Sequence, residues 1–171
     1  MEQSQKLLLD SMCGKLARWL RFLGFDVVYL REVDDESILS IAKSSNRIII
    51  TRDQELHNRA LKNGLKSILL TTTDHVNNMS KILRELNVQI VIPPPVTRCP
   101  LCNNLLKEVS PREIAHLLPS KELMNRYEKF WLCDKCNKVY WIGSHWRNIK
   151  KILSEVEKCM KEGCKFDHVN G

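Results

Sequence analysis

The sequence lacks long hydrophobic runs, internal repeats and low-complexity segments. No apolar stretch approaches the ~18 residues that a membrane-spanning helix needs. The apolar stretch near the start of the sequence is too short for the hydrophobic region of a secretory signal. We therefore expect a soluble protein of the cytoplasm, or of another reducing intracellular compartment, with no membrane partner.

The composition is that of an ordinary globular protein. Of 171 residues, 43% are hydrophobic and 27% are charged, which is enough apolar material for a packed core. The formal net charge is +7, and it is unevenly distributed. Residues 1–95 carry 13 Lys and Arg against 11 Asp and Glu, whereas residues 96–171 carry 14 against 9. This basic excess fits nucleic-acid binding, but ordinary lysine-rich solubility explains it equally well.

Short β-type runs alternate with helical patterns in the first half of the sequence. Helical periodicity predicts helices over residues 12–23, 35–44 (with Asp35 as N-cap), 54–63 and 76–86. Apolar and β-branched runs predict strands at 6–9, 27–30, 47–50 and 67–70, and 88–92 is a candidate for a fifth. Such alternation with short connections predicts an α/β fold with a mainly parallel sheet flanked by helices.

Two C-x-x-C pairs dominate the second half. In a reducing compartment, Cys99, Cys102, Cys133 and Cys136 indicate one tetrahedral Zn²⁺ site rather than disulfides. Four ligands leave no open position, so this zinc should be structural. A redox C-x-x-C motif is the rival interpretation, but such a motif needs only one pair. The remaining cysteines are expected as a buried small side chain (Cys13) and as free thiols (Cys159 and Cys164).

Pro93, Pro94 and Pro95 form a stiff spacer, which we take as the domain boundary. The predicted units are an α/β domain over 1–92, a zinc ribbon with a C-terminal helix over 96–163, and a tail over 164–171. Within the second unit, a capping box from Ser110 to Glu113 predicts a helix over 110–118. Further helices are predicted at 120–127 and 145–160, and a strand at 138–141.

An aspartate follows each predicted strand of the first half. Since the carboxyl ends of parallel strands meet at one edge of a sheet, these carboxylates should lie near one another. They make physical sense together if they hold Mg²⁺ or Mn²⁺, which prefer oxygen ligands and support phosphodiester hydrolysis. Taken singly, each could equally be a helix cap or a turn residue. The candidates are Asp10, Asp35 (with Asp34 as an alternative), Asp53 and Asp74.

Basic and aromatic residues near these two sites are candidates for RNA contacts. Lys15, Arg18, Arg21 and Arg52 are close in sequence to the aspartates and could hold backbone phosphates. Around the second cysteine pair, Lys138, Trp146 and Arg147 could contact RNA, since unstacked bases stack on exposed aromatic rings. Trp131 and Tyr140 fit a small core around zinc better, and Trp141 fits either role.

Several motifs in this order resemble the mut-seven C-terminal RNase domain family, a PIN-like domain followed by a zinc ribbon. They are LLLDSMCGKLARWLRFLGFDVVYL, DESILSIA, RIIITRDQEL, RCPLCN and KFWLCDKCNKVYWIGSHW, and the similarity covers roughly residues 6–153. The resemblance implies a PIN-like nuclease whose acidic positions are matched by Asp10, Asp35 and Asp53. Asp74 is the fourth position that we assign to this metal site.

We therefore expect a Mg²⁺- or Mn²⁺-dependent ribonuclease with a structural zinc. The architecture is similar to that of the endonuclease that matures the 3′ end of small-subunit rRNA, which favours rRNA or tRNA processing, or a ribosomal partner. The main alternative is a non-catalytic RNA- or ribosome-binding adaptor with the same fold, and a protein-interaction scaffold is a second. The presence of all the expected carboxylates favours the enzyme.

Overall fold

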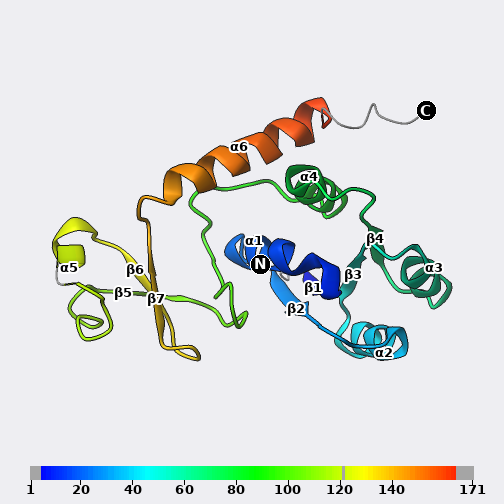
Figure 1. The fold of residues 1–171 in the computed structure, drawn as a ribbon, viewed down its shortest axis with the longest axis horizontal. Coiled ribbons are helices and arrows are strands. Elements are labelled where there is room, and N and C mark those ends of the chain that lie inside the picture. Colours follow the sequence, from blue (N-terminus) through cyan, green and yellow to red (C-terminus); the bar gives the residue numbers. More distant parts are fainter. Residues whose placement is uncertain (1–4, 121, 165–171) are drawn as a thin grey trace.

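The computed structural model describes residues 5–120 and 122–164, which contain two separate sheets (Figure 1). The first is parallel, with strand order β2-β1-β3-β4; the second is antiparallel, with order β5-β6-β7. The strands are β1 (Lys6–Leu9), β2 (Asp26–Tyr29), β3 (Ile48–Thr51), β4 (Ser67–Leu69), β5 (Lys107–Val109), β6 (Phe130–Cys133) and β7 (Lys138–Trp141). The predicted mixed α/β fold with a mainly parallel sheet is confirmed.

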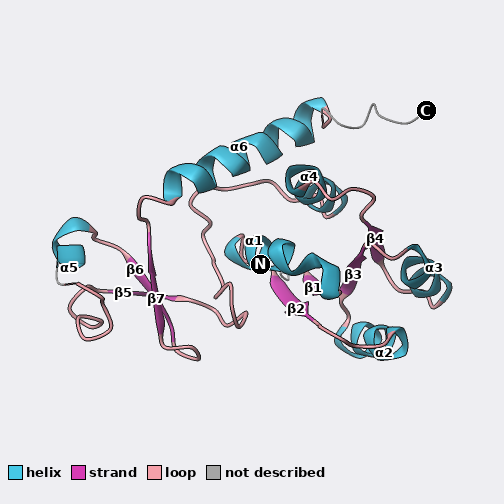
Figure 2. Ribbon diagram, viewed as in Figure 1, coloured by secondary structure: helices cyan, strands magenta, loops and turns pink. Residues whose placement is uncertain are grey.

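Helices cover both faces of the parallel sheet (Figure 2). Side chains alternate across a strand, so Leu7 and Leu9 of β1 face one core and Leu8 faces the other. α1, α4 and α6 pack on the Leu7 side, and α2 and α3 on the Leu8 side. The helices are α1 (Gly14–Phe22), α2 (Asp35–Ser45), α3 (Gln54–Lys62), α4 (His75–Glu85), α5 (Glu122–Arg126) and α6 (Trp146–Glu162), with a short 3₁₀ helix at Ser11–Cys13.

The long C-terminal helix packs on the α/β domain rather than on the ribbon. Val156 is fully buried in the core formed by α1 and α4, and the Ser80 hydroxyl of α4 donates to the Val156 carbonyl. Ile152 and Met160 pack against the same core. α6, which the sequence assigned to the second unit, therefore shares a core with α1 and α4, and the boundary between residues 92 and 96 stays a prediction.

The predicted strand at 88–92 is wrong. The segment follows α4 without joining the sheet; Val88 and Ile90 instead pack against the α1–α4 core. Its next part then runs along the end of α1, where the Thr97 hydroxyl donates to the Phe22 carbonyl. Gly24 permits this close approach because it has a φ of +94° and a Cβ there would lie 2.7 Å from the Val96 carbonyl oxygen.

The predicted helix at 110–118 is also wrong, although its capping interaction forms. The Ser110 backbone N–H and hydroxyl both donate to the Glu113 carboxylate, but residues 111–117 continue as turns. Only Ile114 of this segment is fully buried. A helix here would have no continuous apolar face to pack against the protein, and such packing supplies most of a helix's stability. The helix predicted at 120–127 forms only as the short α5.

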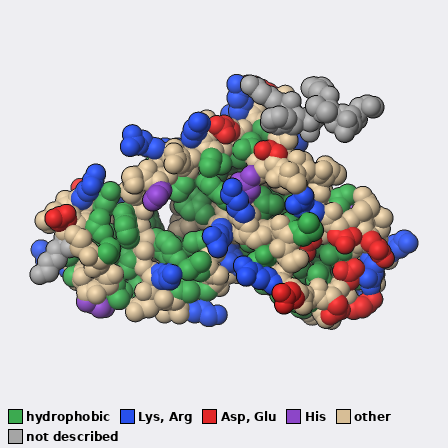
Figure 3. Space-filling view, in the orientation of Figure 1, with side chains coloured by type: hydrophobic (Ala, Val, Ile, Leu, Met, Phe, Trp, Pro, Cys, Tyr) green, Lys and Arg blue, Asp and Glu red, His purple; other side chains and the backbone are tan. Residues whose placement is uncertain are grey.

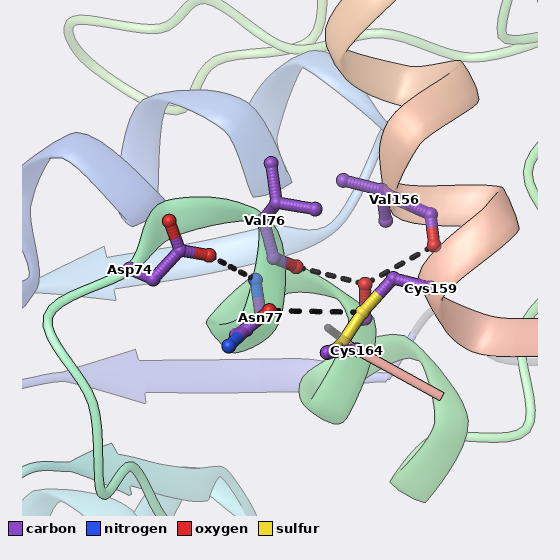
Figure 4. Close-up of a disulfide and its surroundings, with 7 residues drawn as sticks. Asp74, Val76, Asn77, Val156, Cys159 and Cys164 are labelled. Carbon is purple, nitrogen blue, oxygen red and sulfur yellow. Dashed lines mark hydrogen bonds between the residues drawn. A yellow bond between two sulfur atoms is a disulfide. The ribbon is translucent and has the colours of Figure 1, made fainter. Parts of the chain in front are cut away.

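Two predictions about single residues also need correction. The N-cap of α2 is Asp34 rather than Asp35, since its carboxylate accepts from the Ser37 backbone N–H. Cys159 and Cys164, expected as free thiols, are joined in a disulfide (Figure 4). Gly163, with a φ of +83°, turns the chain back after α6 and brings Cys164 to Cys159. Cys13 is buried, as predicted, and the rest of the tail (165–171) lies outside the described residues.

None of the described helices combines the length and the apolar character that crossing a membrane requires.

Candidate functional site

The four paired cysteines converge on one point. Their sulfur atoms all lie within 4.8 Å of one another, and no other group of three or more Cys, His, Asp or Glu in the described residues is as close. Each pair sits in the same kind of tight turn, because the asparagine after it has a positive φ: 70° for Asn103 and 53° for Asn137. Sulfur donors in this arrangement fit Zn²⁺, so the cysteine cluster can hold the predicted structural ion.

The electrostatics of this cluster favour a bound cation. Burial opposes ionisation of Cys99, but hydrogen bonds from the Tyr140 hydroxyl and nearby backbone N–H groups outweigh it and lower its pKa to about 7. Cys136 responds in the opposite direction: hydrogen bonding to Cys102 and desolvation raise the pKa of its thiol to about 12. All four thiols can ionise together only if a cation lies between them, and Zn²⁺ would supply that charge.

Arg21 joins this cluster to the α/β domain. Its buried guanidinium donates through Nη1 to the carbonyls of Pro100 and Leu101, at 3.0 and 3.1 Å, inside the first cysteine turn. Nε and Nη2 donate to the Val27 carbonyl at the sheet edge. Burial lowers the Arg21 pKa, while the nearby Cys99 and Cys102 raise it. Arg21 was a candidate phosphate ligand, but its donors are committed to these carbonyls and its role is structural.

At the carboxyl edge of the parallel sheet, Asp10 and Asp53 are connected through one hydroxyl. Asp10 directly follows β1, is 7% exposed, and accepts from the Met12 backbone N–H and from the Thr51 hydroxyl. The same Thr51 oxygen accepts from the Asp53 backbone N–H at 2.9 Å. Since β1 and β3 are adjacent strands, these two aspartates lie at neighbouring strand ends.

The other candidate aspartates lie after their strands but have partners of their own. Asp35 forms an ion pair with Arg59 of α3 at 3.0 Å. Asp34 is exposed, and hydrogen bonds from the Ser37 backbone and hydroxyl lower its pKa. Asp74 caps α4 by accepting from the Asn77 backbone N–H, and Asp53 likewise caps α3. Within the described chain, the four aspartates do not form a group as close as the cysteines.

Cys13 lies against Asp10 in the interior. Burial, together with the charge of Asp10 and a hydrogen bond to it, raises the pKa of the Cys13 thiol to about 12. Arg52, which stands between Thr51 and Asp53, acts on the same thiol in the opposite direction. The Cys13 thiol is therefore protonated beside the Asp10 carboxylate.

The candidate RNA-contacting residues are divided between two places. Lys15 and Arg18 are exposed on α1, and Arg52 is half-buried at the carboxyl edge of the parallel sheet, which we call the acidic edge because Asp10 and Asp53 lie there. Lys138 is exposed in the ribbon and Arg147 on α6. Arg18 and Trp146 line one pocket of about 290 Å³ between α1, the proline segment, the ribbon and α6. We call it the aromatic pocket, and its aromatic lining consists of Trp19, Phe22, Trp131, Tyr140, Trp141 and Trp146.

Sequence reasoning missed two polar residues of these sites. Thr51 was visible in the TRD motif, but nothing in the sequence says that its hydroxyl reaches Asp10, 41 residues away. His75 also escaped notice. Its ring lies 5.9 Å from that of Trp19, and its Nε2 is buried without a hydrogen-bond partner in the described part of the chain.

Comparisons with known proteins bear on the family alone. No curated protein and no solved structure matches the chain. A family model described as the Mut7-C RNAse domain matches residues 5–153, a range that includes both sheets, the four cysteines and all four candidate aspartates. The chain therefore belongs to the Mut7-C RNAse domain family, which supports a nuclease-like role with RNA as the substrate class.

Proposed function

We propose that this protein is a ribonuclease that hydrolyses RNA phosphodiester bonds with the help of Mg²⁺ or Mn²⁺. The observation that carries the proposal is the link from Asp10 through the Thr51 hydroxyl to Asp53 at two adjacent strand ends. This link holds the buried Asp10 carboxylate near the backbone of Asp53, whose exposed carboxylate caps α3, at the edge of a parallel sheet where ligands commonly bind.

Carboxylate oxygens are the donors that these hard cations prefer, so Asp10 and Asp53 would hold the ion, with Asp35 and Asp74 beside them. When bound, such an ion activates a water molecule and offsets charge on the scissile phosphate. Because Asp35 is paired with Arg59, its participation requires that ion pair to open. Among the cations, Arg52 adjoins Asp53, and Lys15 and Arg18 extend along α1, where they can hold backbone phosphates.

Lys138 of the ribbon, with Trp146 and Arg147 at the start of α6, would increase the affinity for RNA. The basic excess and exposed cations of the ribbon suit a structured RNA with closely spaced phosphates. We place the activity in rRNA or tRNA processing, in the cytoplasm or another reducing intracellular compartment, where Cys159 and Cys164 would be present as thiols.

A cleavage assay tests the mechanism. Wild type, Asp10→Asn and Asp53→Asn are incubated with a hairpin RNA and a single-stranded RNA, with and without added Mn²⁺. Omission is preferable to EDTA, which would also remove zinc. We expect Mn²⁺-dependent cleavage that each substitution lowers at least ~100-fold, because a bound ion contributes several kcal/mol to the transition state. Asp134→Asn, at an exposed ribbon aspartate paired with Lys107, is the matched control. Equal, metal-independent cleavage by all four proteins would indicate contamination and contradict the mechanism.

A non-catalytic RNA- or ribosome-binding adaptor is the second candidate. It is favoured by one observation: Asp35, Asp53 and Asp74 all have ordinary structural partners, as an ion pair or as helix caps. An adaptor would bind RNA with strong salt dependence and cleave none. Salt-sensitive binding without Mn²⁺-dependent cleavage in the same assay would select it.

A further inference from the structure

The aromatic pocket is built from both halves of the chain. α1 contributes Trp19 and Phe22, the ribbon contributes Trp131 and Trp141, and α6 contributes Trp146. Phe22 and Trp146 meet edge to face with their ring centroids 5.9 Å apart, which ties the two halves together at the wall. The lining is almost entirely apolar. In Figure 3, hydrophobic side chains gather in a recess between the ribbon and α1, with Lys and Arg side chains nearby.

The wall of the pocket leads toward the acidic edge. Trp19 contacts the ring of His75, and His75 directly follows Asp74 at the start of α4. An RNA strand lying along Lys15 and Arg18 would thus pass from the aromatic pocket to the aspartates.

The size and chemistry of the pocket suit a single flat ring system. Its volume of about 290 Å³ is at the lower end of the ~300–1,000 Å³ usual for small-molecule sites. Several half-buried indole rings offer faces on which a base can stack, and stacking is tolerant of base identity. Arg18 is exposed at the same pocket and can reach a phosphate, whereas Arg98 already donates to the carbonyls of Gly24 and Asn103.

We propose that the aromatic pocket receives one unstacked nucleobase of the RNA substrate while Arg18 holds the adjoining phosphate. The inference rests on the proposed function for the presence of RNA, and it goes further by naming the substrate feature: an unpaired nucleotide in the strand that is cleaved. The protein selects RNAs with a bulged or looped base over continuous duplexes.

A binding experiment without added divalent ions tests this separately from catalysis. Three RNA hairpins are compared: one with a single bulged purine, one with an abasic nucleotide at the same bulge, and one fully paired. The abasic RNA keeps the backbone and its bend but has no base to stack. Wild type is expected to bind the bulged purine roughly 5- to 150-fold more tightly than the abasic RNA, the ratio that stacking on aromatic side chains supports.

Protein variants locate the preference. Trp131→Leu keeps an apolar side chain but removes one stacking surface. The Kd for the abasic RNA divided by the Kd for the purine-bulge RNA should therefore fall toward one. The same substrate series with Lys138→Gln, outside the pocket, should keep the ratio while weakening all three complexes. Zinc content and circular dichroism show whether each variant is folded, and the comparison of RNAs in wild type needs no variant.

Equal affinity of wild type for the purine and abasic bulges would overturn the proposal, and so would a preference that survives both Trp131→Leu and Trp146→Leu. Adenosine monophosphate is included as a competitor. If it displaced the bulged RNA at an equal concentration, the pocket would be a mononucleotide site rather than an RNA site. A base preference in a protein that never cleaves RNA would leave this inference intact and remove the proposed catalysis.

Discussion

At the scale of single residues, one hydroxyl organises the acidic edge. Thr51 is fully buried, donates to Asp10 and accepts from the Asp53 backbone N–H. It thereby provides a hydrogen bond to a buried carboxylate, whose burial without such bonds would destabilise the fold. Because its hydroxyl is engaged by Asp10 and by the Asp53 N–H, we assign Thr51 as a positioning residue for Asp10.

We predict that Thr51→Val weakens both stability and cleavage. Valine has nearly the same shape, but it leaves the Asp10 carboxylate with the Met12 backbone N–H as its remaining donor and the Asp53 N–H without its acceptor. The free energy of unfolding should fall by ~1–3 kcal/mol, the usual cost of an unsatisfied buried polar group. Activity should fall at least tenfold and require more Mn²⁺, because the carboxylate is no longer held in place. Urea unfolding and the Mn²⁺ dependence of kcat/KM measure these effects.

Thr51→Ser separates positioning from packing. Serine restores the hydroxyl but lacks the methyl group, so it should recover the Mn²⁺ dependence while remaining somewhat less stable. A Thr51→Ser enzyme with the same Mn²⁺ requirement as Thr51→Val would mean that the hydroxyl does not position Asp10.

The sequence reveals candidate acids but not their partners. Asp10, Asp53 and Asp74 could be named because each follows an apolar run, and the order of strand and acid is a local pattern. Arg59, which pairs with Asp35, is 24 residues away, and such contacts depend on how helices pack on the sheet. The exchange of Asp34 for Asp35 as N-cap is a shift of one residue, which local pattern does not resolve.

At the scale of elements, α1 serves both halves of the molecule. Its buried side carries Leu16 and Leu20 into the core, and its exposed side carries Lys15 and Arg18. Arg21, at its last turn, reaches across to the first cysteine turn. One helix therefore connects the sheet, the zinc cluster and the proposed RNA path.

We predict that Arg21→Met loosens this connection. The substitution leaves the carbonyls of Val27, Pro100 and Leu101 without donors and should cost ~1–3 kcal/mol of stability. It also removes a positive charge beside the thiolates, so zinc should exchange faster with a chromogenic chelator. Arg18→Met, one turn earlier on the exposed side of the same helix, is the matched control and should leave the unfolding midpoint unchanged. Equal effects of the two substitutions would argue against a special role for Arg21.

Helices and strands could be predicted from the sequence where the spacing of apolar residues determines them. Each strand of the parallel sheet is a short run of Leu, Ile or Val, and each predicted boundary lies within one or two residues of the observed one. β5 and β6 escaped because strands of the ribbon are short and half-exposed, so they carry no clear alternation. Residues 110–118 show the opposite error: a good capping sequence does not make a helix without an apolar face to bury.

At the scale of the whole molecule, two sources of stability coexist. The α/β domain has an apolar core on each side of its sheet. Apart from the cysteines, the buried apolar residues of the ribbon within the described chain are Ile114 and Phe130, so we expect its stability to depend on an ion held by the cysteines. The two parts meet through Arg21 and through Asn103, whose side chain accepts from the Val27 backbone N–H and donates to Asp26.

Removing zinc should therefore unfold the ribbon and spare the α/β domain. Hydrogen exchange followed by mass spectrometry should show β6 and β7 losing amide protection after chelation, while β1 and β3, buried between two cores, keep theirs. The end of α1 should become partly exposed because Arg21 loses its carbonyl partners in the cysteine turn. Zinc added back should restore protection, and Cys102→Ser should reproduce the chelated state. If both sheets lost protection together, the molecule would be one cooperative unit. If neither did, zinc would not stabilise the ribbon.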